Sequence, residues 1–126
     1  MDRNTASAVF ECLASGHRLD IYRLLVRHAP DGLVAGEIGA QLGLPPTNLS
    51  FHLKTMAHAG LVRVTPEGRF QRYCAELSLM SALIDYLTAE CCQGEPARCA
   101  ELAVASCCAE PATEQARPRS APRRLP

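Results

Sequence analysis

Apolar residues in the first half of the chain recur at the spacing of amphipathic helices, and turn-forming residues interrupt the recurrence. The apolar stripes expected on the first two helices are Ala6, Val9, Phe10 and Leu13, then Leu19, Tyr22, Leu25 and Val26. Proline or glycine breaks the pattern after the second, third and fourth segments. The predicted helices are residues 5–14, 17–28, 35–42 and about 47–58.

The fourth predicted helix has an apolar side and a polar side. Its apolar residues recur at i, i+4 and i+7, which predicts a buried face made of Leu49, Leu53 and Met56. Pro45 and Pro46 suit a helix start, where a missing N–H does no harm, and Thr47 or Asn48 is expected to cap it. Thr47, Phe51, Lys54 and His58 point away from the buried face, with Ser50 and His52 on its flanks.

A β-hairpin is predicted directly after this helix. β-forming residues at 61–65 and 69–73 flank a short loop, Pro66–Gly68. The order short helix, turn, second helix, hairpin is that of a helix-turn-helix with a wing. We therefore expect a mainly α fold with a β-hairpin wing, a winged helix-turn-helix.

A last long helix is predicted over residues 78–90, and its apolar face is wide for so small a domain. Pairing of this face with the first helix across a two-fold axis would bury it and make a homodimer. The alternative is that the face packs on the chain's own core. Its apolar residues are Leu79, Met80, Leu83, Ile84 and Leu87.

The polar side of the fourth helix predicts binding to double-stranded DNA, because a helix fits the major groove, where base edges are distinguishable. Phe51 is suited to a thymine methyl group, whereas Asn48, Ser50 and His52 are suited to polar base edges. Phosphate contacts are expected from Thr47 and Lys54 on the helix and from Arg69 and Arg72 on the hairpin. The competing interpretation is that the helix-turn-helix only packs within the fold and does not bind DNA.

Composition limits how the chain can bind DNA and where in the cell it is expected. The 126 residues carry 13 basic and 13 acidic side chains, so DNA binding must come from an uneven charge distribution. No apolar run approaches the length of a membrane helix, and the first residues lack a signal-peptide core. We expect a cytoplasmic chain without membrane contact, in which the seven cysteines stay reduced.

Three cysteines just beyond the last long helix, Cys91, Cys92 and Cys99, are the sharpest chemical feature. Three thiolates without a nearby histidine suit a trigonal thiophilic ion such as arsenite or antimonite, whereas zinc would need a fourth ligand. Cys107 and Cys108 could supply a fourth ligand, a second site or a relay. Cys12 and Cys74 are instead expected to be buried for packing.

Two other interpretations of the thiols remain. Disulfide formation among the C-terminal cysteines would make the protein a redox-sensing repressor. Cys92 to Arg98 also spells C-x5-R, the pattern of cysteine-nucleophile enzymes such as arsenate reductases. That loop should follow a strand, and Pro96 removes one of its N–H donors, so we expect no enzymatic activity.

From Arg18 to Tyr73 the chain resembles the arsenic-responsive branch of the ArsR/SmtB family of winged-helix repressors. The resemblance implies a homodimer that binds operator DNA and releases it with inducer, here As(III) or Sb(III), without an organic cofactor. Many members place the arsenic-binding thiols on the first helix of the helix-turn-helix. In this chain that helix, residues 36–42, has no cysteine, so the resemblance implies a site at Cys91, Cys92 and Cys99. The resemblance rests on the motifs R-L-D-I-Y-R-L-L (18–25), G-E-I-G (36–39), L-S-F-H-L-K (49–54), A-G-L-V (59–62) and G-R-F-Q-R-Y (68–73).

The expected organisation has three parts. Residues 1–92 form the DNA-binding and dimerisation domain, residues 93–109 form a cysteine-rich sensing segment, and residues 110–126 form a disordered tail rich in proline, alanine and arginine.

Overall fold

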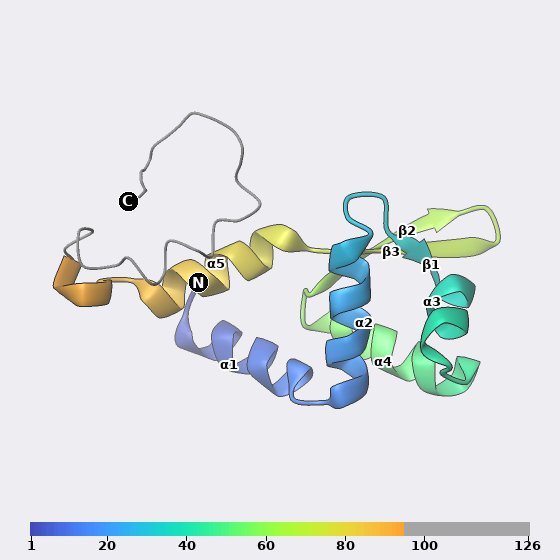
Figure 1. Ribbon diagram of the computed structural model, residues 1–126, viewed down its shortest axis with the longest axis horizontal. Coiled ribbons are helices and arrows are strands. Elements are labelled where there is room, and N and C mark those ends of the chain that lie inside the picture. The colour runs from blue at the N-terminus through green and yellow to red at the C-terminus, as the bar shows by residue number, and fades with distance from the viewer. Residues whose placement is uncertain (95–126) are drawn as a thin grey trace. The chain divides into compact units, whose positions relative to one another are not determined.

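The computed structural model describes residues 1–94, and the chain divides after Tyr86 into two units. The first unit contains four helices, a small sheet and most of a fifth helix (Figure 1). A short 3-10 helix, η1 (Cys91–Gly94), lies in the second unit. The elements of the first unit are α1 (Arg3–Leu13), α2 (Gly16–Arg27), β1 (Leu33–Val34), α3 (Ala35–Leu42), α4 (Pro46–His58), β2 (Val62–Glu67), β3 (Phe70–Ala75) and α5 (Leu77–Thr88), whose last residues belong to the second unit.

The helix starts follow ordinary capping chemistry. Asp2 accepts a hydrogen bond from the backbone N–H of Thr5 at 2.8 Å, which satisfies a free donor at the start of α1. At the start of α4 the N-cap is Pro45, and no side chain caps the helix. The expectation that Thr47 or Asn48 caps α4 is therefore wrong. Pro46 at the first position has no N–H, so one fewer donor needs a partner.

The sheet has three antiparallel strands in the order β1-β3-β2. Strand β1 was not predicted, because two residues are too few to show an alternating pattern. The hairpin is confirmed, but its predicted loop is wrong. Glu67 pairs with Phe70, so the turn is Gly68-Arg69, and Pro66 lies in strand β2. The edge position of β2 tolerates a proline, which lacks a ladder donor.

The predicted buried side of α4 is confirmed, since Leu49, Leu53 and Met56 are all at most 3% exposed. They join a core to which all five helices and the sheet contribute. Cys12 and Cys74 are buried as predicted. The largest fully buried side chains are Ile21, Leu25, Ile38, Leu53, Met56, Leu61 and Val9.

The predicted apolar stripes of the other helices are wider than the faces that are actually buried. On α1, Ala6, Val9 and Cys12 are buried but Phe10 is not, and on α2 Ile21 and Leu24 are buried in addition to the predicted Tyr22 and Leu25. On α5 only Leu83 is fully buried. Each helix packs along a narrow line, so the outer members of its stripe face solvent. Exposed members of the predicted apolar stripes are Phe10, Leu19, Val26, Ile84 and Leu87, and the last two belong to the face that is predicted to pair across a two-fold axis.

Among residues 1–94, no helix is long and apolar enough to cross a membrane. The observed elements confirm the predicted mainly α fold with a β-hairpin wing, here β2 and β3 with their turn.

Candidate nucleic-acid interface

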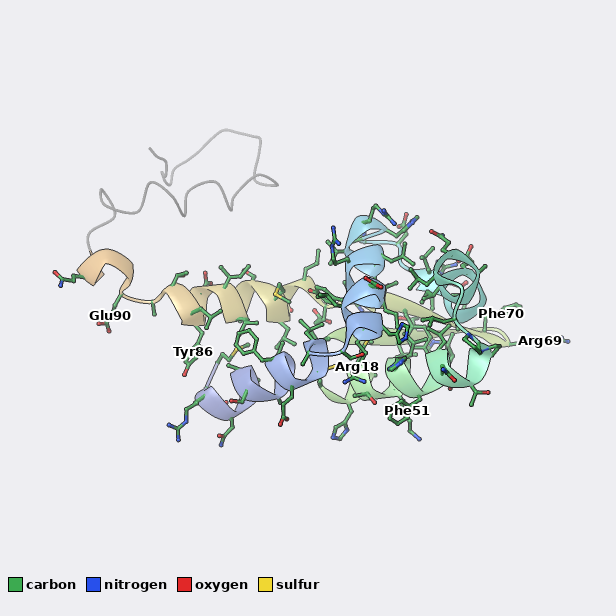
Figure 2. The ribbon with its side chains drawn as sticks, turned by 60° about the horizontal axis from the view of Figure 1, so that its bottom comes forward. Arg18, Phe51, Arg69, Phe70, Tyr86 and Glu90 are labelled. Carbon is green, nitrogen blue, oxygen red and sulfur yellow. The ribbon has the colours of Figure 1, made fainter. Side chains whose placement is uncertain are left out.

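Helix α4 presents a continuous exposed surface opposite its buried side. Phe51 is 65% exposed, an unusual position for a phenylalanine, and Figure 2 shows it pointing away from the other helices. The structure brings most of the predicted helix contacts together on this surface. The exposed members are Thr47, Asn48, Ser50, Phe51 and Lys54.

A tight turn between α3 and α4 sets the direction of this surface. Gly43 ends α3 in the left-handed region at φ 66°, and the N–H of Leu44 donates to the Gly39 carbonyl at 3.2 Å. A Cβ at Gly39 would lie 3.3 Å from the Leu44 carbonyl oxygen, so the turn folds closely over α3. The turn therefore fixes α4 against α3, as a reading helix requires.

His52 lies on the flank of α4 and is hydrogen-bonded within the protein. Its Nδ1 is 3.2 Å from Nη1 of Arg18, whose Nε donates to the Cys12 carbonyl at 2.6 Å. The His17 ring lies 5.6 Å from the His52 ring, centroid to centroid. Partial burial, together with the charges of Arg18 and His17, lowers the pKa of His52 below its usual value. His52 is therefore a neutral side chain at neutral pH.

The arginines of the wing have different environments. Arg72 forms a two-point ion pair with Glu67, and the pKa of that carboxyl is lowered by these hydrogen bonds. Arg63 pairs with Glu76 at 2.9 Å. Arg69 occupies the turn, where Figure 2 shows it at the tip of the wing beside Phe70. In the described part of the chain, Arg69 has no ion pair, so it is the wing cation available to a phosphate.

The base of the wing is held by the loop before β1. Arg72 Nη1 donates to the Gly32 carbonyl at 3.1 Å, and Cys74 Sγ donates to the Asp31 carbonyl at 3.5 Å. Gly32 has φ +76°, and a Cβ there would fall on the Tyr73 carbonyl oxygen and 2.6 Å from Cys74 Sγ. Only glycine fits this position. The loop thus fixes the wing relative to the helices.

The predicted thiol ligands fall largely outside the described residues. Cys99, Cys107 and Cys108 lie beyond residue 94, and the side chains of Cys91 and Cys92 in η1 are also outside. Among the side chains that the structure does describe, no three His, Cys, Asp or Glu residues form a metal-binding group. Burial raises the pKa of the Cys12 thiol, against an opposing effect of Arg18.

The sequence does not indicate two residues that belong to this interface, Arg18 on α2 and Phe70 on β3. In the sequence Arg18 is distinguished only as part of a motif, although its guanidinium contacts His52 on α4, 34 positions away. The sequence predicts Phe70 only as a strand residue, yet it is 62% exposed and lies at the wing tip (Figure 2). The shift of the hairpin turn, from Pro66–Gly68 to Gly68-Arg69, accounts for the second omission. No local signal indicates the first.

Residues 13–65 match the family model described as a helix-turn-helix domain. A comparison with curated protein sequences gives no significant match. The family model spans α2 to α4 and most of β2, so the predicted helix-turn-helix is confirmed where the exposed surface lies.

Many solved structures share the fold, including the following three. HlyU from Vibrio cholerae is 28% identical, with 74% of this chain and 100% of that chain covered and a TM-score of 0.58. An ArsR-like transcriptional regulator from Rhodococcus sp. is 22% identical, with coverages of 81% and 93% and a TM-score of 0.63. The homodimeric winged helix-turn-helix DNA-binding domain of a possible ArsR-family regulator from Mycobacterium bovis is 25% identical, with coverages of 73% and 85% and a TM-score of 0.55.

Proposed function

We propose that this chain is a homodimeric transcriptional repressor that binds operator DNA through α4 and the wing. The observation that carries the proposal is the exposed polar surface of α4 around Phe51, fixed from beneath by the buried Leu49, Leu53 and Met56. A phenylalanine held in water by a rigid helix is suited to contact with a thymine methyl group. The similarity to solved transcriptional regulators supports this function.

The wing supplies the phosphate contacts in this proposal. Arg69 is unpaired within the described residues and lies at the wing tip, and Lys54 is exposed on α4. Both cations are available to phosphates on either side of a groove that holds α4. Arg72 is partly buried and already hydrogen-bonded to Glu67 and to the Gly32 carbonyl, so it contributes mainly by holding Glu67 and the wing in place.

The proposed dimer forms through α1 and α5, which lie side by side within the first unit in both views (Figure 1, Figure 2). Phe10 is 48% exposed, and Leu77 and Tyr86 are exposed as well. A second copy would cover these side chains by the hydrophobic effect. The related domain from Mycobacterium bovis is homodimeric, which supports this assembly.

The proposed inducer is trivalent arsenic or antimony, bound by the thiolates of Cys91, Cys92 and Cys99, with Cys107 and Cys108 as further candidates. The support is chemical, because soft thiolates select thiophilic ions and three sulfurs match a trigonal ion. Binding just after α5 would act on a helix of the proposed dimer interface. Coupling of about 1–3 kcal/mol is typical of such switches.

The test first uses the protein to select the duplexes that it prefers from a random pool. It then measures whether arsenite makes the protein release a selected duplex. Cys92→Ser should bind the selected duplex with unchanged affinity but should no longer release it with arsenite. Gln93→Ser is the matched control, since it alters an exposed neighbour that is not a thiol. Release of Cys92→Ser at the wild-type arsenite level would refute the sensing site, and release by peroxide alone would favour the redox alternative.

A further inference from the structure

Arg18 connects three helices through one guanidinium group. It lies at the start of α2, donates from Nε to the Cys12 carbonyl near the end of α1, and reaches His52 on α4 with Nη1. Its own backbone N–H donates to the Ser15 side chain at 3.4 Å. A carbonyl in the last turn of a helix lacks an intrahelical partner, so Cys12 is a natural acceptor for this cation. The guanidinium is therefore fixed before it meets His52.

The contact with Arg18 determines which nitrogen of His52 carries the proton. A guanidinium has only donors and does not lose its proton in proteins, so Nη1 donates and His52 Nδ1 accepts. An accepting Nδ1 means a neutral imidazole whose hydrogen is on Nε2. The two ring nitrogens face different directions, so the Nε2–H is directed away from Arg18.

We propose that Arg18 is a positioning residue that holds His52 as a neutral Nε2–H donor, so that the reading helix recognises a base with a major-groove acceptor. This inference rests on the proposed function. A lone donor can bind N7 or O6 of guanine, but it repels the amino group that cytosine presents in the same groove. Guanine offers both acceptors side by side, so it is the expected base opposite His52.

The groups around His52 reinforce the neutral state. The positive charge of Arg18 and the ring of His17 both come from α2, and the Phe51 ring on α4 itself lies 5.7 Å away in an edge-on arrangement. No carboxylate is hydrogen-bonded or ion-paired to His52 within residues 1–94. The pKa of His52 is correspondingly lowered by burial, Arg18 and His17.

The first experiment uses the free protein and needs no DNA. Nitrogen-15 NMR of the full chain should show His52 as the Nε2–H tautomer at neutral pH. In Arg18→Met, which keeps a long side chain but loses the donor, His52 should become a mixture of tautomers with a raised pKa. Arg23→Met, an exposed arginine on the same helix, should change neither property. An Nδ1–H tautomer in the wild-type protein would overturn the inference.

The second experiment selects preferred duplexes from a random pool with wild type, Arg18→Met, His52→Gln and His52→Ala. Wild type should require guanine at one position per half-site, with about a tenfold loss of affinity when cytosine replaces it. His52→Gln places an N–H near the Nε2 position and should keep part of this preference. His52→Ala and Arg18→Met should lose it while retaining the other selected positions.

The outcomes separate the two proposals. If wild type selects no preferred duplex, the repressor proposal fails, whereas the tautomer is still decided by NMR. If a preferred duplex exists but Arg18→Met selects the same guanine as wild type, the role of Arg18 is refuted and the repressor proposal stands. Should Arg18→Met fail to fold by circular dichroism, the wild-type tautomer and the contrast between His52→Gln and His52→Ala decide the question.

Discussion

Arg72 donates two hydrogen bonds to the carboxylate of Glu67, from Nε to Oε2 at 2.8 Å and from Nη2 to Oε1 at 3.0 Å. Arg72 pairs with Thr65 across the hairpin, so Glu67 lies two residues farther along the same face. The third nitrogen of the guanidinium reaches the Gly32 carbonyl. One side chain thus neutralises the acid of the wing and ties the wing to the helical body.

This pairing predicts unequal roles for the wing arginines in DNA binding. Arg69→Met should reduce the slope of log affinity against log salt by about 0.9 per lost phosphate contact, hence about 1.8 for a dimer. Arg63→Met is the matched control and should alter the slope less, because Arg63 already pairs with Glu76. Fluorescence anisotropy over a salt series measures both. Equal slopes for wild type and Arg69→Met would contradict a phosphate contact by Arg69.

Substitution of Arg72 should have a different effect from substitution of Arg69, because it also leaves the negative charge of Glu67 without its partner. Arg72→Met should therefore weaken DNA binding, whereas the double variant Arg72→Met with Glu67→Gln should recover much of the loss. The same anisotropy titrations apply. A double variant as weak as Arg72→Met alone would show that Arg72 contacts DNA directly.

Gly32 predicts a stability effect at the base of the wing. Gly32→Ala places a methyl group on the Tyr73 carbonyl oxygen in a left-handed backbone conformation, so we expect a loss of at least about 2 kcal/mol. Gly36→Ala is the control, because its Cβ meets open space on helix α3. That substitution should stabilise the protein by about 0.5–1 kcal/mol. Urea unfolding monitored by circular dichroism measures both changes.

Substitutions on the two sides of α4 should affect different properties, stability on the buried side and DNA recognition on the exposed side. Leu53→Ala removes a buried side chain and should cost about 2–5 kcal/mol of unfolding free energy. Phe51→Ala, two positions earlier and exposed, should change stability by less than about 0.5 kcal/mol. It should nevertheless lose the preference for thymine at one position of the selected duplex. Retention of that preference by a folded Phe51→Ala protein would show that another residue reads the methyl group.

Much of this architecture follows from local sequence signals. The spacing of Leu49, Leu53 and Met56 sufficed to place α4 and its buried side, because a 3.6-residue period is a property of the helix itself. The glycine after α3 likewise marked the turn. The exposed surface of α4 followed directly from these two facts.

Other features depend on contacts between distant residues and left no local signal. Phe10 and Val26 look like core residues in the sequence, but their exposure depends on how the neighbouring helices pack. The sequence places Arg69 and Arg72 on the wing, yet only the register of β2 and β3 pairs Arg72 with Glu67. Arg18 and His52 meet in the same way, through the packing of α2 on α4.

The exposure of Phe10 predicts how the dimer can be broken. Phe10→Glu should place a charge in the proposed interface of each protomer and raise the dimer dissociation constant at least about tenfold. The fold of the monomer should survive, because Phe10 is 48% exposed in the single chain. Val26→Glu, on an exposed apolar position of α2, is the control. Sedimentation velocity over a concentration series measures the constant, and an unchanged dimer would exclude Phe10 from the interface.

The lowered pKa of His52 makes a prediction about folding stability in acid. The unfolded chain takes up a proton near the usual histidine pKa of 6.5, whereas the folded chain resists it until a lower pH. The unfolded state therefore binds more protons in that window, and stability must fall as the pH drops from about 7 through the usual value, levelling off below the folded pKa. His52→Gln should lose this component and show a flatter profile, whereas His58→Gln, on an exposed position of the same helix, should keep it. Urea unfolding at several pH values between 5 and 8 provides the test, at about one-half pH steps around the histidine window. A His52→Gln profile as steep as that of wild type would mean that Arg18 does not hold His52 in its neutral form.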